Sequence, residues 1–242
     1  MTDNKHPKVL HDISFLLEAG NVLGVLGRTG SGKTTLTRLL FRLYDVDAGA
    51  ITLDGINVRD VALSDLRQRV GLATPEVQLF EATVRDNLTL FRNYDETAVP
   101  ITDDQIHHAI HTLGLDAWLD NLPNGLDTML KSGGKGLSAG EAQLLAFTRV
   151  FLRDPHLIIL DEASSRLDPV TEQLLERAID QLLHGRTAII IAHRLETVQR
   201  ANDILILENG RIIEHSPRPQ LAATPGSRFA QLLQTGLEEA LA

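Results

Sequence analysis

The chain has 242 residues, 43% of them hydrophobic and 23% charged, which is typical of a globular protein with a sizeable core. Its 32 acidic and 23 basic residues leave a net charge of −9, and an acidic surface that repels phosphate backbones disfavours general nucleic-acid binding. The absence of cysteine excludes disulfides, thiolate nucleophiles and cysteine-bound zinc. No apolar run exceeds about a quarter of a bilayer span, and the first residues lack the apolar segment of a signal peptide, so we expect a soluble chain.

Short apolar runs rich in Val, Ile and Leu recur along the chain and predict strands that are covered on both faces. These runs lie at residues 22–26, 50–53, 157–160, 187–191 and 204–207. Residues 36–43 and 170–182 carry apolar side chains at helical spacing between them. Alternating strands and helices predict an α/β domain with a mostly parallel sheet.

The middle third of the chain reads as polar helices interrupted by proline and glycine. Because the strand-like pattern resumes at Leu157, we interpret this stretch as an insertion rather than a separate domain. We therefore expect one domain over residues 1–242. Its parts are an α/β core (about 1–81 and 152–226), a helical subdomain (about 82–151) and a C-terminal helix (about 227–242).

A glycine-rich loop follows the first apolar run. Residues 27–34, here called the phosphate loop, read G-R-T-G-S-G-K-T and match G-x-x-x-x-G-K-[ST] between a predicted strand and a predicted helix. Glycines let backbone N–H groups approach anionic oxygens, and the helix N-terminus adds the positive end of its dipole. Lys33 can reach the β- and γ-phosphates, and the Thr34 hydroxyl can ligate Mg²⁺. The predicted nucleotide-binding residues are Gly27, Arg28, Thr29, Gly30, Ser31, Gly32, Lys33, Thr34 and Thr35.

The apolar run at 157–160 ends in two carboxylates, Asp161 and Glu162. Asp161 suits the Mg²⁺ shell in the manner of a Walker B aspartate. Glu162 is one residue further on, displaced from the metal, where it can polarise a water for attack on the γ-phosphate. The alternative is a solvated strand end or helix cap, but together with the phosphate loop we favour hydrolysis. No N-K-x-D guanine motif is present, which argues against a GTPase.

Three further motifs carry a family resemblance. Residues 137–141, L-S-A-G-E, resemble the LSGGQ signature of the ABC ATPases, and we call this segment the signature. Residues 165–168 resemble the D-loop of that family, and His193 resembles its switch histidine. The sequence segments 51–55, 66–71, 84–88 and 210–214 are similar to the corresponding segments of exporter-type nucleotide-binding domains. The resemblance covers essentially the whole chain.

The resemblance implies a P-loop fold with a mostly parallel sheet, an antiparallel β portion near the N-terminus and an inserted helical subdomain. It also implies ATP and Mg²⁺ as cofactors, with Lys33, Glu162 and His193 as catalytic residues and Thr34 and Asp161 at the metal. Glu162 would act as general base and His193 would contact the γ-phosphate.

The family also implies a second nucleotide-binding domain, in a homodimer or a heterodimer. ATP would lie between the phosphate loop of one subunit and the signature of the other. Ser138 and Gly140 would complete an anion site for the partner's γ-phosphate, and Asp168 would organise the partner's site.

ATP-driven closure of this dimer, and its reopening after hydrolysis, would power export through transmembrane domains fused upstream in the full-length protein. The chain would then lie on the cytoplasmic side of the inner membrane and would bind no nucleic acid.

Three positions depart from the family pattern. Pro75 stands where the family has a glutamine that contacts Mg²⁺ and relays motion to the membrane domain, so we expect weaker metal positioning or coupling. Residues 1–8 contain no aromatic other than His6 to stack on adenine, which predicts weaker ATP affinity. Ser132 replaces a glutamate that touches the membrane domain.

Two other functions stay open at this point. A soluble ABC ATPase acting on DNA or ribosomes is disfavoured by the single ATPase unit and by the net charge of −9. A catalytically weak, regulatory nucleotide-binding domain is suggested by Pro75, whereas the presence of Glu162 and His193 argues against outright inactivity.

Overall fold

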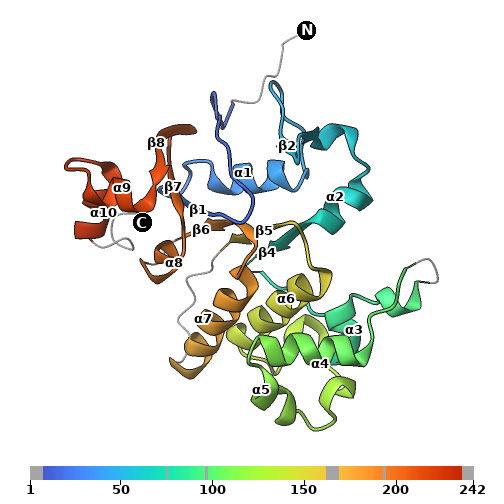
Figure 1. Ribbon diagram of the computed structural model, residues 1–242. Helices are drawn as coiled ribbons and strands as arrows, with labels where there is room; N and C mark the ends of the chain where they lie inside the picture. The colour runs from blue at the N-terminus through green and yellow to red at the C-terminus, as the bar shows by residue number, and fades with distance from the viewer. Residues whose placement is uncertain (1–7, 75, 96–97, 162–168, 193–194, 236–242) are drawn as a thin grey trace. The chain divides into compact units, whose positions relative to one another are not determined.

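The computed structural model describes residues 8–74, 76–95, 98–161, 169–192 and 195–235 (Figure 1). The chain divides into two compact units. The first comprises Met1–Val70, Ile159–Glu162 and Thr187–Ala242, and the second comprises Gly71–Ile158 and Ala163–Arg186.

The main sheet has six strands in the order β4-β5-β6-β1-β7-β8. Their bounds are β1 Val22–Leu26, β4 Val70–Ala73, β5 Leu157–Asp161, β6 Thr187–Ile191, β7 Asp203–Glu208 and β8 Arg211–Pro217. Strand β1 pairs in parallel with β6 and with β7, whereas β7 and β8 are antiparallel. Every residue of β1 is buried, as its unbroken apolar run predicts. The mostly parallel α/β sheet predicted from the sequence is confirmed.

A separate two-stranded ribbon follows the first helix. Strands β2 (Thr52–Leu53) and β3 (Ile56–Asn57) pair antiparallel around Asp54 and Gly55, which have φ of 52° and 77°. Asp-Gly is a favoured pair for a two-residue hairpin turn that needs positive φ at both positions. This ribbon confirms the antiparallel β portion near the N-terminus.

The remaining elements of the first unit are helical. They are α1 Lys33–Leu40, η1 Val58–Asp60, α2 Leu63–Arg69, α8 Leu195–Gln199, α9 Arg218–Ala223 and α10 Arg228–Thr235. Helices α9 and α10 lie beside β7 and β8 (Figure 1). The Glu214 carboxylate from β8 accepts hydrogen bonds from the N–H groups of Arg228 and Phe229, at 2.5 and 3.1 Å. A carboxylate at this position stabilises the start of α10, which buries Phe229 and Leu232.

The second unit is mostly helical, as predicted for the insertion. Its elements are α3 Val84–Thr89, η2 Arg92–Tyr94, α4 Asp103–Thr112, α5 Asp116–Asp120, η3 Gly125–Asp127, η4 Ser132–Gly134, α6 Ala139–Arg153 and α7 Pro169–Leu183. Helix α6 packs against α3, α4 and α7. It buries Leu144 and Leu145, while α4 buries Ile106 and Ile110. Across the part of the chain that is described, no helix has the length and apolar character to cross a membrane.

Candidate nucleotide-binding site

The phosphate loop connects β1 to α1 in the first unit. Gly27, Gly30 and Gly32 have φ of 152°, 80° and 110°, conformations that other residues rarely adopt. At Gly27 a Cβ atom would collide with the carbonyl oxygen of Leu207 and lie 2.6 Å from Ser31 Oγ. Glycine at this position therefore allows the close backbone approach that forms the loop.

Lys33, the first residue of α1, is buried with its side chain folded over the phosphate loop. Its Nζ donates hydrogen bonds to the carbonyl oxygens of Gly27 and Arg28, the latter at 3.1 Å. Burial lowers the pKa of Lys33, and the nearby negative charge of Asp161 partly opposes this effect. The loop thus holds a desolvated cation, and an anionic ligand would stabilise that charge.

The start of α1 leaves polar groups available to a ligand. Its N-cap is Gly32, which provides no side-chain acceptor, and its first turn contains no acidic residue. The Ser31 hydroxyl is buried and has no hydrogen-bond partner among the described residues. Leaving a buried hydroxyl unpaired costs about 1–3 kcal/mol. These features fit the oxygens of a bound polyphosphate.

Asp161 and Thr34 are the two residues that the sequence predicts at a metal ion. Asp161 ends β5, whose four preceding residues are buried, and its charge acts on Lys33. Thr34 is exposed in the first turn of α1, so its hydroxyl is accessible to a ligand, and Thr35 beside it is half-buried. The described residues contain no cluster of three or more potential metal-ligating side chains.

Several predicted residues lie outside the part of the chain that the structure describes. They are Glu162, Asp168, His193 and Pro75. The residues 1–7, where the aromatic was expected, are also outside it. Ser132 is described, and it is exposed at the start of η4.

The signature lies at the start of α6 in the second unit. Ser138 is the N-cap: its Oγ accepts a hydrogen bond from the Glu141 N–H at 3.2 Å. The Glu141 Oε2 in turn accepts one from the Ser138 N–H at 2.7 Å, which completes a capping box. Gly140 is buried within the first turn. The geometry presents Ser138 at an exposed helix N-terminus.

Sequence reasoning missed one residue at this position. Trp118, in α5, is 9% exposed, and its indole N–H donates a hydrogen bond to Glu141 Oε1 at 3.2 Å. No motif links a tryptophan in one helix to a capping residue 23 positions later in another. An apolar period in α5 predicts burial of Trp118 but does not reveal this partner.

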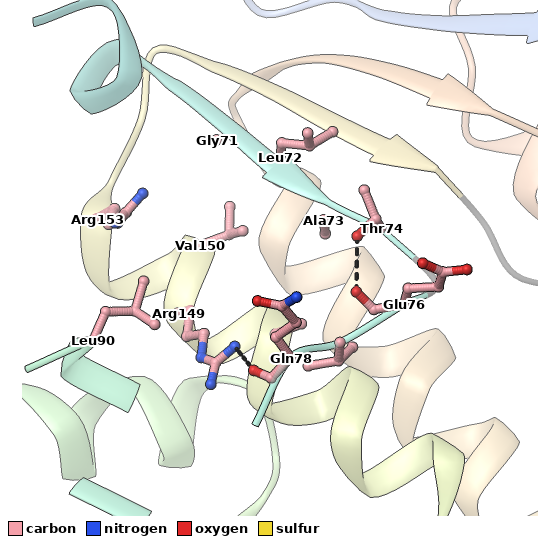
Figure 2. A pocket seen from close by; sticks show the side chains of 12 residues that line it. Gly71, Leu72, Ala73, Thr74, Glu76, Gln78, Leu90, Arg149, Val150 and Arg153 are labelled. Carbon is pink, nitrogen blue, oxygen red and sulfur yellow. Dashed lines mark hydrogen bonds between the residues drawn. The ribbon is translucent and has the colours of Figure 1, made fainter. Parts of the chain in front are cut away.

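A cavity of about 150 Å³ lies between β4, the segment that follows it and α6. Figure 2 shows Arg149 directed toward the backbone of Gln78, whose carbonyl accepts a hydrogen bond from Nη1 at 2.9 Å. Arg149 also donates to the carbonyl of Asn87 at 2.8 Å. Burial and the neighbouring Arg153 lower the pKa of Arg149 to about 10, so it remains cationic at neutral pH.

Three aromatic rings form an exposed group in the same unit. Phe80 and Phe91 meet edge to face with centroids 5.4 Å apart, and Tyr94 lies 6.4 Å from Phe91. Their exposed fractions are 43%, 37% and 72%. We call Phe80, Phe91 and Tyr94 the aromatic surface.

Comparisons with known proteins agree with this geometry. A family described as ABC transporter matches residues 10–165. An ATP-dependent lipid A-core flippase of Pseudomonas aeruginosa is 40% identical over 232 residues, covering 96% of this chain and 38% of that protein. The flippase of the same name from Vibrio cholerae is 38% identical over 228 residues, covering 94% of this chain and 38% of that protein.

A solved structure is also similar. It is that of a bacterial Atm1-family ABC exporter with ATP bound, with a TM-score of 0.84 and 31% identity over 96% of this chain and 40% of that chain. The chain thus spans about two fifths of the length of the relatives that it matches.

Proposed function

This chain belongs to the ABC transporter family as an exporter-type ATP-binding domain, and we propose that it hydrolyses Mg-ATP to power export through membrane-spanning domains. The observation that carries the proposal is the buried Lys33 ammonium inside the phosphate loop, beside an unpaired Ser31 hydroxyl and within the field of Asp161. This combination is unfavourable without an anion and favourable with one.

The chain's own residues divide the chemistry between them. The phosphate loop and Lys33 bind and orient the β- and γ-phosphates. Mg²⁺, held by Thr34 and Asp161, would neutralise charge that develops on the phosphates. Glu162 accepts a proton from the attacking water, whose oxygen bonds to the γ-phosphorus as the bond to ADP breaks. His193 contacts the γ-phosphate and maintains the attack geometry.

A second nucleotide-binding domain completes each site. Ser138 and Gly140, at the N-terminus of α6, hold the γ-phosphate bound to the partner, while Asp168 organises the partner's site. The exposure of Ser138 supports this role because a partner can reach it. The partner nucleotide-binding domain would be either a second copy of this chain or a different protein's domain.

The membrane-spanning partner is proposed to be fused upstream. The relatives are more than twice as long as this chain, which supports a longer protein. The cavity beside Gln78 and the aromatic surface give the second unit a hollow and exposed rings against which a cytoplasmic loop of that domain could pack. The domain would then operate at the cytoplasmic side of the inner membrane.

One observation favours a second candidate. Pro75 replaces a residue that the family uses for metal positioning and coupling, which is consistent with a catalytically weak, regulatory nucleotide-binding domain. Such a domain would bind ATP and dimerise but hydrolyse slowly.

Light scattering of the Glu162→Gln variant, with and without Mg-ATP, tests the proposal. Removing the general base blocks hydrolysis and traps the ATP-bound dimer, so the mass should double from 26.6 kDa only when Mg-ATP is present. The matched control adds Ser138→Arg, whose long side chain should prevent the signature from reaching the partner's phosphate. A monomer at every Mg-ATP concentration would rule out a homodimer of this chain as the ATP-bound state and would leave a different nucleotide-binding domain as the required partner.

A further inference from the structure

The Glu141 side chain joins two helices at the signature. One carboxylate oxygen accepts the indole N–H of Trp118 from α5 at 3.2 Å, and the other accepts the backbone N–H of Ser138 at 2.7 Å. Trp118 is buried and is the only tryptophan in the sequence. The carboxylate thus uses a separate oxygen for each donor, and both donors are N–H groups.

A second capping box in the same unit provides a comparison. At the start of α4, Gln105 Oε1 accepts the N–H of Thr102 at 2.9 Å, and Thr102 Oγ1 accepts the N–H of Gln105 at 3.3 Å. The same Gln105 oxygen also accepts the Thr102 hydroxyl at 3.3 Å, so both of its donors come from one residue. An amide has a single acceptor oxygen, and its other end is itself a donor.

In the orientation of the Glu141 side chain, a glutamine would turn its NH₂ group toward either the Trp118 indole or the Ser138 N–H and place two donors face to face. To keep both bonds, its single amide oxygen would have to move and accept from both donors. The glutamate in L-S-A-G-E, where the pattern it resembles has glutamine, thus suits a position with two N–H donors better than glutamine does.

We propose that Trp118 and Glu141 are positioning residues that fix the first turn of α6, so that Ser138 is held ready for the partner's γ-phosphate. The inference rests on the proposed function, because it assumes that the signature completes a partner's ATP site. Hydrogen bonds to an ionised carboxylate are stronger than neutral ones, and the buried indole anchors this one to α5. The network therefore acts through Ser138 and does not contact ATP itself.

A double-mutant cycle in the Glu162→Gln background tests the proposal. Trp118→Phe keeps an aromatic ring in the core but removes the N–H donor. It should weaken Mg-ATP-dependent dimerisation about tenfold while leaving the ATP affinity of the monomer unchanged. Glu141→Gln also removes a negative charge near the phosphate, so the coupling between the two substitutions is the diagnostic quantity. We expect Glu141→Gln to be several-fold more damaging with Trp118 present than after Trp118→Phe.

Gln105→Ala is the matched structural control. It removes the equivalent capping box from α4 in the same unit, so it should lower the melting temperature without changing the dimer dissociation constant. Equal dimerisation of Trp118→Phe and its parent, additive effects in the cycle, or an equal loss caused by Gln105→Ala would each overturn the proposal. A parent that fails to dimerise would overturn a homodimer of this chain, and the nucleotide-free measurements below then decide whether the network orders the signature.

Two measurements without nucleotide separate the inference from the proposed function. Since Trp118 is the sole tryptophan, Glu141→Gln should change the protein's tryptophan emission directly. Trp118→Phe should accelerate hydrogen exchange at the Ser138 amide by several-fold, because its acceptor is no longer held in place. Unchanged emission and unchanged exchange would show that the network does not order the signature.

Discussion

At the scale of single residues, the electrostatics of Lys33 connect stability to ligand binding. Its ammonium is buried and its pKa is lowered, so the folded protein loses the proton at a lower pH than the unfolded chain. Between the two pKa values the unfolded chain binds more protons, and stability therefore rises with pH. The charged form of Lys33 thus carries a free-energy cost at neutral pH, and a bound polyphosphate would reduce it.

The Lys33→Met variant tests both the free-energy cost of the buried charge and its role in binding polyphosphate. The variant should bind Mg-ATP at least about tenfold more weakly and lose hydrolysis, since the phosphates lose their buried cation. Without nucleotide, its stability relative to the parent should be greatest at neutral pH and should decline as pH rises past about 10.4, the ordinary lysine pKa, above which the parent's lysine becomes neutral in both states. Urea denaturation at several pH values measures this difference. Lys131→Met, at an exposed position, should show neither effect.

The sequence predicted the residues of this site unevenly. Gly27 and Lys33 belong to a motif whose spacing is dictated by phosphate geometry, so the order of residues alone leads to their proposed roles. The same is true of Ser138, which the structure places at an N-cap. Trp118 could not be predicted, because its bond to Glu141 depends on how α5 packs against α6.

At the scale of elements, the strands that the sequence predicted are those with continuous apolar runs. Strand β1 is an example, since burial on both faces requires apolar residues at every position. Strands β4 and β8 were missed: β4 has four residues, and its Gly71 weakens the pattern, while β8 alternates exposed and half-buried residues and has no continuous apolar run. A Cβ at Gly71 would lie 2.7 Å from Pro155 and 2.9 Å from Val150, so the glycine meets a packing requirement that only the structure reveals.

Arg149 connects α6 to α3 and to the segment that precedes α3. Its guanidinium donates to the carbonyls of Gln78 and Asn87 and, at 3.2 Å, to the Asn87 Oδ1. Arg149→Lys keeps the charge but cannot reproduce this planar fork, so we expect a loss of about 1–3 kcal/mol in the free energy of unfolding. Chemical denaturation measures it. Arg153→Lys is the control, because Arg153 makes no hydrogen bond within the described part of the chain, and its effect should stay within about 0.5 kcal/mol.

At the scale of the whole molecule, the two compact units carry different halves of the proposed chemistry. The phosphate loop belongs to the first unit, and the signature belongs to the second. The first unit holds the buried Lys33 cation, and the second holds the capped N-terminus of α6. In the proposed head-to-tail dimer, one chain would supply one half to each of the two ATP sites.

The net charge of −9 makes a prediction about that dimer. Two copies of the chain repel each other, and the bound nucleotides add further negative charge at the interface. The screening length falls from about 30 Å at 0.01 M salt to about 8 Å at 0.15 M, so added salt weakens this long-range repulsion. Self-association of Glu162→Gln at saturating Mg-ATP should therefore strengthen several-fold over this range, as measured by light scattering.

Association that weakens with salt would instead indicate complementary charges at the interface. Tighter pairing at low salt with a basic nucleotide-binding domain would point to a heterodimer.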